Sequence, residues 1–304
     1  MMKKTFVSIH GGLGNQLFQL GLAVKLSEQS NVEILPWKRH CRTDSSGKIW
    51  IDYYRLAMRF TPTNFVLDRF FIFYTRACFK ILLEKQRRNL SGGALWLLYR
   101  CLIALPRSFG VRIITTAEMG DFEIPPLLRR NYVFAYFQTQ EAATAIRELL
   151  VRENSESPPK CDEMAELDKE VLVLHIRRTD YKENPRIGLL PEEYFRAALK
   201  ELSGKYTWDE LWLFSDDPQE AIFMVPEEFK SKLRVMPDEA KTPNEVIALM
   251  AFGNSFILSN STFGWWAANL AYVPPKYVIV PNKWFKHMDE PVGLIPSDWF
   301  RVGT

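Results

Sequence analysis

The pattern of apolar and polar positions at the start of the chain predicts a strand, a turn, a helix and a second strand. Residues 5–10 form a mostly apolar run typical of a buried strand, and residues 11–14 are rich in glycine. Residues 15–29 carry apolar side chains at helical spacing, and residues 32–35 return to a strand pattern. This order opens a parallel sheet, and the ligands of such sheets bind at the carboxyl ends of the strands.

The middle of the chain separates two series of strands. Residues 64–111 are helical in pattern, aromatic and basic, and residues 132–137 predict another strand that leads into a helix near Glu141. Residues 152–169 are rich in Glu, Ser, Pro and Lys without a strong apolar period, which predicts an exposed connector. The first domain is therefore expected to end at this connector.

After the connector, short apolar strands alternate with helices. The predicted strands are residues 171–174, 211–214, 255–258 and 277–280, and the predicted helices include residues 191–202 and 243–252. Together the patterns predict the α/β class, with two Rossmann-like domains that face each other and each contain a parallel sheet. Residues 1–155 form the first predicted domain, which has a helical insertion, and residues 165–304 form the second.

Composition narrows the class of protein without naming a function. The chain has 39 basic and 36 acidic residues, a net charge of +3, which does not indicate a nucleic-acid partner. The four cysteines are scattered and form no C-x-x-C pair, which argues against a zinc site and a disulfide framework. No apolar run approaches the ~20 residues of a membrane helix, and the first residues do not resemble a signal peptide. A cytoplasmic setting is therefore expected.

The first candidate site is the turn that contains Gly12 and Gly14, followed directly by Asn15 and Gln16. Glycine allows the backbone to approach a ligand closely, and the N-terminus of the following helix offers unpaired N–H groups. Two amide side chains after the turn can hydrogen-bond a sugar or a phosphate. The spacing differs from the dinucleotide fingerprint, and a purely structural turn between strand and helix is the alternative.

The second candidate site follows residues 171–174, where His175, Arg177, Arg178 and Asp180 stand within six residues. Adjacent arginines at the carboxyl end of a strand suit a pyrophosphate, because guanidinium groups bind phosphate oxygens through paired hydrogen bonds and stay charged. The structural alternative is a local ion pair between an arginine and Asp180, beside a buried histidine with no ligand role.

A third strand also ends in polar residues, because Asp216 and Asp217 follow residues 211–214. Their carboxylates can accept hydrogen bonds from a guanine base or a ribose hydroxyl. In the structural alternative an aspartate caps the next helix, which begins with Pro218, and both interpretations can hold for different aspartates.

The fourth candidate site is the start of a helix after residues 255–258, with Asn260, Ser261, Thr262 and Phe263. Hydroxyls, backbone N–H groups and about half a positive charge from the helix dipole suit a phosphate there, although capping alone is the alternative. The chain contains no D-x-D motif and no His and carboxylate ligands at metal-binding spacing, so no metal cofactor is expected.

These four pieces, together with Ala135-Tyr136-Phe137-Gln138, resemble the α-1,2-fucosyltransferase family, which shares the glycine-Asn-Gln opening and an H-x-R-R-x-D motif. The resemblance runs from about residue 5 to residue 282, apart from residues 64–119. The H-x-R-R-x-D piece is also similar to that of α-1,6- and protein O-fucosyltransferases. Residues 250–254 lack the Cys and His often seen there, and Gly264 stands where Ser is common.

The resemblance implies a metal-independent glycosyltransferase of the GT-B type, with GDP-fucose held mainly by the second domain and the acceptor approaching from the first. It assigns the β-phosphate to Arg177, the pocket around it to Arg178 and His175, the phosphates to Ser261 and Thr262, the nucleoside to Asp216 or Asp217, and the fucose to Asn15. The candidate substrate-binding set is completed by Gly12, Gly14, Gln16, Asn260 and Phe263.

The implied reaction is an inverting transfer of L-fucose to the 2-hydroxyl of a terminal galactose on an oligosaccharide, such as a surface glycan or O-antigen. Arg177 would stabilise the charge that grows on the leaving β-phosphate. Asp180 and Glu183 are candidate bases, and a loose transition state can also proceed without one. The alternatives are another linkage, another nucleotide sugar, or a GDP-sugar or glycan-binding protein without catalysis.

Residues 70–110 combine seven basic residues and many aromatic and leucine side chains with one acidic residue, Glu84. The simpler interpretation is a helical layer with a solvated basic face. The other is a peripheral contact with the anionic inner face of a bacterial membrane, where a lipid-linked acceptor would lie.

Overall fold

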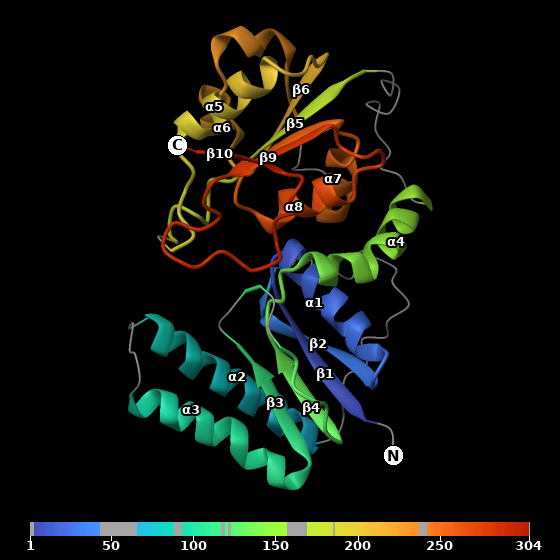
Figure 1. The fold of residues 1–304 in the computed structure, drawn as a ribbon, viewed down its shortest axis with the longest axis vertical. Helices are drawn as coiled ribbons and strands as arrows, with labels where there is room; N and C mark the ends of the chain where they lie inside the picture. Colours follow the sequence, from blue (N-terminus) through green and yellow to red (C-terminus); the bar gives the residue numbers. More distant parts are fainter. Residues whose placement is uncertain are drawn as a thin grey trace. The chain divides into compact units, whose positions relative to one another are not determined.

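The computed structural model describes residues 3–42, 66–87, 93–116, 119–120, 123–156, 169–184, 186–236 and 242–303. The chain divides into two compact units, each of which contains one sheet (Figure 1). Unit 1 contains the described residues up to Ile146 together with Pro291–Leu294. Unit 2 contains the described residues of Arg147–Glu290 and those that follow Ile295.

The sheet of unit 1 has four described strands in the order β2-β1-β4-β3, and every neighbouring pair runs parallel. The strands are β1 (Lys4–Gly11), β2 (Asn31–Cys41), β3 (Val111–Thr115) and β4 (Arg130–Phe134). The six inner residues of β1 are all buried, as expected for a central parallel strand covered on both faces. The carboxyl end of β1 therefore lies in the middle of the edge at which the parallel strands end.

Helix α1 (Leu13–Ser27) packs on one face of this sheet, and the start of α4 (Gln140–Glu156) packs against α1. They approach each other closely because residue 21 is a glycine: a Cβ there would lie 2.0 Å from the Ala142 carbonyl oxygen. The short return of the chain at Pro291–Leu294 belongs to the same unit, and the Gln140 N–H donates to the Gly293 carbonyl at 2.8 Å.

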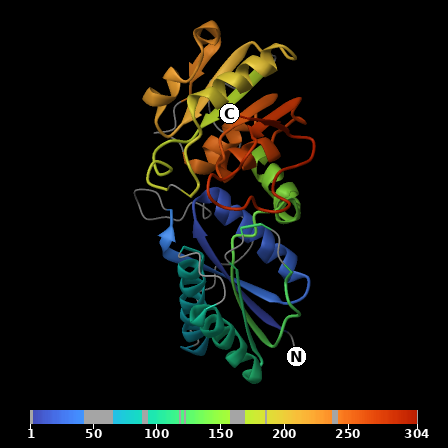
Figure 2. The ribbon, with the colours of Figure 1, turned by 60° about the vertical axis from the view of Figure 1, so that its left-hand side comes forward.

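The helical insertion of unit 1 covers the other face of the sheet (Figure 2). It consists of α2 (Val66–Arg87), α3 (Ala94–Ala104) and the 3-10 helix η2 (Leu105–Phe109). Ile72 of α2 packs into a buried cluster with Phe6 and Tyr132, whose rings stack at a centroid distance of 4.9 Å. The insertion is therefore a packed layer of unit 1.

The sheet of unit 2 has six described strands in the order β10-β9-β8-β5-β6-β7, again parallel throughout. The strands are β5 (Val171–Ile176), β6 (Glu210–Ser215), β7 (Leu233–Val235), β8 (Ser255–Leu258), β9 (Tyr277–Pro281) and β10 (Phe300–Val302). β5 is completely buried between β6 and β8, so the residues after it stand between the ends of those two strands.

Helices cover the unit 2 sheet as well. They are α5 (Glu192–Ser203), α6 (Pro218–Phe223), the 3-10 helix η4 (Glu227–Lys232), α7 (Pro243–Met250) and α8 (Thr262–Asn269). Tyr194 and Phe195 of α5 pack into the core with Leu172 and Leu213 of the central strands. On α8, Trp265 and Trp266 are fully buried, so they serve packing.

Two units that each contain a parallel sheet confirm the predicted α/β fold class. All the predicted strands are present, although the one predicted at residues 132–137 ends at Phe134 and is followed by Phe137 at a positive φ of 52°. The helix expected at residues 15–29 begins earlier, at Leu13. Three of the described strands were not predicted, namely β3, β7 and β10.

The connector predicted at residues 152–169 differs from the structure at its start, because α4 continues through Glu156. Residues 157–168, which include the predicted boundary between 155 and 165, lie outside the described residues. The division between the units falls inside α4, between Ile146 and Arg147. Of the described helices, none combines the length and the apolar character needed to cross a membrane.

Candidate functional site

Arg177 lies at the carboxyl end of β5 and is held from two sides by carboxylates. Its Nε lies 2.9 Å from Asp180 Oδ1 and 3.1 Å from Asp216 Oδ2. Its backbone N–H donates to the Ser259 hydroxyl at 2.9 Å, and that hydroxyl donates in turn to the His175 carbonyl at 2.9 Å. The guanidinium is thus fixed in direction, while its side chain keeps 17% of its surface exposed.

Asp216, at the end of β6, organises the backbone that follows β5. One carboxylate oxygen accepts from the Arg178 N–H at 2.7 Å, and the other accepts from the N–H and the hydroxyl of Thr179. Burial opposes ionisation of Asp216, but Arg177 and these hydrogen bonds outweigh it and hold the pKa of Asp216 below its usual value. Both carboxylate oxygens of Asp216 therefore bind groups of this chain.

Asp217 caps the helix that follows it. Its Oδ1 accepts from the Glu220 N–H at 3.1 Å, and Pro218 occupies the first helical position. The structural alternative therefore holds for this aspartate. Its other oxygen lies 3.3 Å from Lys182 Nζ, in a partly exposed position.

Arg178 points away from Arg177, although the two residues are adjacent. Its Nη1 donates to the Leu190 carbonyl at 3.0 Å, and its Nη2 pairs with Glu220. Hydrogen bonds from Arg178 and from Lys182, which lies 2.6 Å from the other Glu220 oxygen, lower the pKa of Glu220 to about 2. Arg178 thus ties the loop before α5 to α6, and the arginine that points to the sheet edge is Arg177.

His175 is buried beneath this charged edge. Burial, assisted by the positive charge of Arg177, lowers the pKa of His175 to about 4, so the ring is neutral at neutral pH. Its Nδ1 has no hydrogen-bond partner among the described residues, and the ring lies 6.1 Å from that of Phe263. A Cβ on Gly264 would lie 2.7 Å from Nδ1, so a side chain at this position would require the His175 ring to shift.

The N-terminus of α8 lies beside Arg177 on the same edge. Ser261 caps the helix, accepting from the Phe263 N–H at 3.3 Å, and Thr262 is the first helical residue. Asn260 donates to the Gly188 carbonyl at 3.2 Å and accepts at its own carbonyl from the Tyr181 hydroxyl at 3.1 Å. The predicted group of hydroxyls and N–H donors is therefore present where the strands end.

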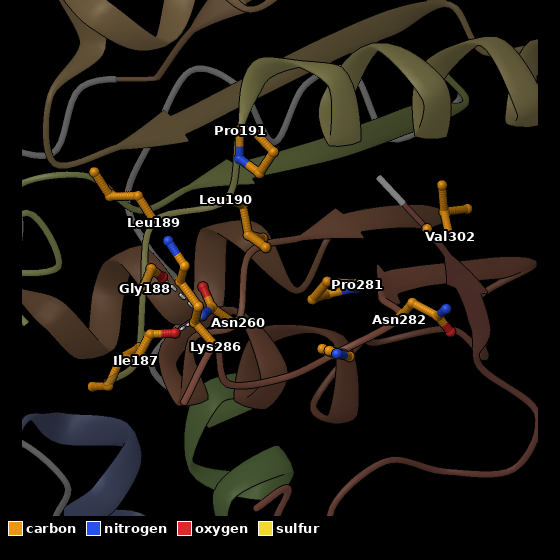
Figure 3. Close-up of a pocket in the computed structure, with 12 residues that line it drawn as sticks. Ile187, Gly188, Leu189, Leu190, Pro191, Asn260, Pro281, Asn282, Lys286 and Val302 are labelled. Atoms are coloured by element: carbon orange, nitrogen blue, oxygen red, sulfur yellow. Dashed lines mark hydrogen bonds between the residues drawn. The ribbon is translucent and has the colours of Figure 1, made fainter. Parts of the chain in front are cut away.

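A pocket of about 520 Å³ opens next to these residues (Figure 3). Asn260 forms part of its wall, beside the ends of β9 and β10 and the loop before α5. Its lining combines apolar and polar groups: Ile187, Gly188, Leu189, Leu190, Pro191, Asn260, Pro281, Asn282, Lys283, Lys286, Val302 and Gly303. Lys283 and Lys286 are its charged lining residues, which gives the pocket a positive character.

The edge of the unit 1 sheet carries amides. Gly11 ends β1 with a positive φ of 81°, a conformation that favours glycine, and its carbonyl accepts from Gln16 Nε2 at 2.7 Å. Gln16 is fully buried, so it closes the turn. Asn15 Oδ1 accepts from Gln138 Nε2 at 2.8 Å, while the buried Gln138 Oε1 has no partner among the described residues.

The predicted residues thus fall into two groups. Gly12 caps α1, and Gly12, Gly14, Asn15 and Gln16 all belong to unit 1. The remaining candidates belong to unit 2, where Glu183 lies exposed in the turn after Asp180. No group of three or more His, Cys, Asp or Glu side chains suited to a metal occurs in the part of the chain that the structure describes.

Sequence reasoning missed several residues that support the site. Ser259, Glu220 and Lys182 hold Arg177, Arg178 and Asp217 in place. Ser259 directly precedes the predicted group that begins at Asn260, but its partner at position 177 is 82 residues away in the sequence. Gln138 was noted in a motif without a role, and its contact with Asn15 spans 123 residues.

Comparison of the sequence with known proteins shows which protein family the chain resembles. Residues 112–290 match the model of glycosyl transferase family 11. The chain is 26% identical to the O-antigen biosynthesis glycosyltransferase WbnK of Escherichia coli, over 91% of this chain and 93% of that protein. It is 28% identical to an alpha-1,2-colitosyltransferase of Escherichia coli over 42% of this chain and 46% of that protein.

A solved structure is also similar in fold. The fucosyltransferase NodZ from Bradyrhizobium matches 88% of this chain and 92% of its own, with 12% identity and a TM-score of 0.46. The family match covers more than half of the chain and includes the Arg177 cluster, the Asp216 turn and the start of α8. The chain belongs to glycosyl transferase family 11, the α-1,2-fucosyltransferase family, as its motifs predicted.

Proposed function

We propose that the protein transfers L-fucose from GDP-fucose, with inversion, to the 2-hydroxyl of a terminal galactose on an oligosaccharide such as an O-antigen unit. Family membership supports the reaction, and the relative named for O-antigen biosynthesis supports the acceptor class. The observation that carries the proposal is Arg177, a partly exposed guanidinium fixed by Asp180 and Asp216 at the carboxyl edge of a parallel sheet.

Arg177 would bind the β-phosphate of GDP and stabilise the charge that grows there as the bond to fucose breaks. A preorganised cation is effective because it does not have to reorient during the reaction. Ser261 and Thr262, at the N-terminus of α8, would bind the phosphates with hydroxyl and N–H groups. These groups supply positive potential from the protein itself, so the proposal invokes no metal.

The remaining residues would shape the donor site. Asp217 would recognise the nucleoside, because 29% of its side-chain surface is exposed, against 17% for Asp216, which also contacts Arg177. Neutral His175 and Phe263 would form an apolar floor beneath the diphosphate, and Asn260 would connect the site to the adjacent pocket.

For unit 1 we propose a sugar-binding role. Asn15 lies at the carboxyl end of β1, where an amide can both donate to and accept from sugar hydroxyls. Gln16 would act indirectly by closing the turn at Gly11, and Gly12 and Gly14 would let a substrate approach the backbone at the start of α1. Gln138 would fix the orientation of the Asn15 side chain through the hydrogen bond between them.

Two carboxylates remain candidates for the base that accepts the proton of the acceptor hydroxyl. Asp180 already accepts from Arg177 at 2.9 Å, which occupies one oxygen and weakens it as a proton acceptor. Glu183 is exposed in the same turn. Asp180 is therefore the better positioning residue for Arg177, and Glu183 is the better candidate base.

A second donor is favoured by one comparison. The relative named as an alpha-1,2-colitosyltransferase matches 42% of this chain. A donor with colitose in place of fucose would use the same diphosphate contacts, because Arg177 reads the phosphate and not the sugar attached to it. Donor specificity must therefore be measured directly.

The test is GDP release in EDTA from GDP-fucose, from GDP-colitose and from GDP-mannose as control, with a panel of terminal-galactose acceptors. The proposal expects acceptor-dependent release from GDP-fucose and a new α-1,2 linkage by NMR. Release from GDP-colitose alone would move the assignment to the second donor. Binding of GDP without turnover of any donor would contradict both and leave a binding protein.

A further inference from the structure

Exposed apolar side chains gather on the helical insertion of unit 1. We call this surface the apolar face and define it as Val66, Phe70 and Phe73 of α2, Leu97 and Leu98 of α3, and Leu105 of η2. Phe73 is 73% exposed and Leu97 is 63% exposed. Side chains of this size are usually buried, and a group of them on one surface indicates an interaction.

Helical spacing separates the apolar face from the core. On α2, Asp68, Ile72 and Phe79 are buried against the sheet, and at about 100° per residue Phe70 and Phe73 point to the opposite side. α2 therefore carries apolar residues on both of its sides. Packing within unit 1 explains the inner side alone.

The same division holds on α3. Ile103 packs against the buried cluster of unit 1, and Leu97 and Leu98 lie on the far side of the helix; Leu105, the first residue of η2, is exposed as well. α2 and α3 pack side by side on one face of the sheet (Figure 2), so both outer sides look away from that sheet. The helical layer expected for residues 70–110 is therefore present, and its outer surface carries exposed apolar side chains as well as exposed basic ones.

Charge around the apolar face has one sign. Arg69, Lys80, Arg100 and Arg107 are exposed on the same three helices. Among the side chains described in these helices, the acidic one is Asp68, which is 1% exposed and paired with Arg130. The exposed charges near the apolar face are therefore cationic, which complements an anionic partner.

We propose that the apolar face docks unit 1 onto the surface of an anionic lipid bilayer. Phe70, Phe73 and Leu97 would enter the boundary between headgroups and acyl chains, and Arg69 and Arg107 would lie at the lipid phosphates. Exposed apolar side chains flanked by cations are the combination that such binding requires. The inference concerns the helical insertion and does not depend on the donor or the acceptor.

Flotation of the full-length protein with vesicles tests the docking. One set of vesicles contains phosphatidylcholine alone, and the other contains about a third phosphatidylglycerol as the anionic lipid. The protein is expected to float with the anionic vesicles at low salt and to be released at high salt, since salt screens the arginine contacts. Failure to float with anionic vesicles at low salt overturns the proposal.

Two double variants locate the contact. Phe70→Ser with Phe73→Ser should weaken binding to anionic vesicles by at least about tenfold, because it removes two inserted side chains. Arg69→Gln with Arg107→Gln should weaken it by about fivefold per charge. All the substituted side chains are exposed, so the melting temperature should be unchanged.

Matched controls come from other surfaces. Phe223→Ser removes an aromatic side chain that is also 73% exposed but belongs to α6 of unit 2. Lys3→Gln with Lys200→Gln removes two exposed charges away from the insertion. Controls that reduce binding as much as the test variants overturn the proposal. A concentration-dependent dimer that Phe73→Ser disrupts, without vesicle binding, overturns it in favour of a second copy of this chain.

Discussion

The carboxyl edges of the two sheets have different chemistry. The edge of unit 1 presents uncharged amides, with Asn15 and Gln138 joined by a hydrogen bond at 2.8 Å. The edge of unit 2 presents a guanidinium held between carboxylates, with Arg177 near Asp180 and Asp216. Parallel sheets provide both edges with the same backbone geometry, so side chains alone decide what each can bind.

The difference fits the partners proposed for the two edges. A diphosphate is bound best by a cation that is fixed in direction, and the carboxylates beside Arg177 fix the direction of its guanidinium group. Sugar hydroxyls need groups that donate and accept, which amides do. Each edge can be altered separately, because the interactions described above for Arg177 and for Asn15 lie within unit 2 and unit 1 respectively.

Removing the cation from the unit 2 edge should have the largest effect. Arg177→Ala is expected to raise the barrier by roughly 3 to 4 kcal/mol, about 100- to 1,000-fold in kcat, by analogy with the loss of an oxyanion donor. The measurement is GDP release at saturating donor. Arg196→Ala is the matched control, because Arg196 is exposed and pairs with Glu192 one helical turn away.

Near-normal kcat in Arg177→Ala would contradict the role of this arginine in the leaving-group site. Arg177→Lys sharpens the test: a lysine keeps the charge but loses the fixed fork between two carboxylates, so partial activity is expected. Equal activity of the lysine variant and the original protein would mean that charge alone suffices at this edge.

Gly264, which packs against His175 beneath the charged edge of the unit 2 sheet, should be the next most sensitive position to substitution. Gly264→Ala places a Cβ 2.7 Å from His175 Nδ1, and the resulting overpacking should destabilise the fold by up to about 3 kcal/mol. Urea unfolding measures the loss. Gly204→Ala is the control, because the nearest atom to its Cβ would be 3.6 Å away. Combining Gly264→Ala with His175→Ala should recover part of the loss; strict additivity would show that the histidine is not the obstacle.

Neutral His175 gives the unit 2 edge a specific pH dependence. Its pKa of about 4 lies below the ordinary 6.5, so the unfolded chain binds a proton below pH 6.5 that the folded protein does not. The stability linked to this group is complete above pH 6.5 and is lost as the pH falls toward 4. Between pH 6.5 and 5 the loss should be about 2 kcal/mol, from ~1.4 kcal/mol per pH unit.

Urea unfolding at pH 6.5 and 5 measures this slope, and His175→Gln should remove it. A slope that persists in His175→Gln would assign the pH dependence to other groups. Asp216 does not interfere in this window: its pKa is lowered, so its stability is present above the unfolded pKa and is lost only at more acidic pH.

The sequence predicted the residues at the carboxyl edge of the unit 2 sheet better than the residues that hold them in place. The buried run Val171–Ile176 followed at once by Arg177 identifies a strand and the group at its end, and this depends on local pattern alone. The direction of Arg178 could not be predicted, because Glu220 is 42 residues away and only the packing of α6 beside β5 brings it close. Likewise, the sequence could not predict that Asp216 binds the backbone after β5 while Asp217 caps α6, because this depends on which aspartate faces the turn after β5.

The unit 1 edge shows the same limit. The turn at Gly11 and the amides after it are visible in the sequence, but the pairing of Asn15 with Gln138 requires β1 and β4 to be neighbours. The exposure of the apolar face on α2 and α3 could not be predicted from the sequence for another reason. Apolar residues on both sides of a helix predict burial on both sides, and only the structure shows which side the sheet covers.

Substitutions at the carboxyl edge of the unit 1 sheet should have the smallest effect on activity. They should also show that the two edges bind different parts of the substrates. Asn15→Ala is expected to lower kcat/KM by about tenfold, because one or two uncharged hydrogen bonds of about 1 kcal/mol each are lost. GDP affinity, measured by calorimetry, should stay unchanged, since GDP is assigned to unit 2. Asn31→Ala is the control, because Asn31 is exposed at the start of β2, away from the carboxyl edge.

Asn15→Asp sharpens this result further. The aspartate keeps an oxygen for Gln138 Nε2 but loses the N–H donor, so it tests binding of the sugar without disturbing the amide pair. A loss similar to that of Asn15→Ala would assign the effect to the missing donor. A fall in GDP affinity in Asn15→Ala would contradict the separation, because removing an uncharged amide that binds only sugar hydroxyls has no reason to weaken binding of the nucleotide.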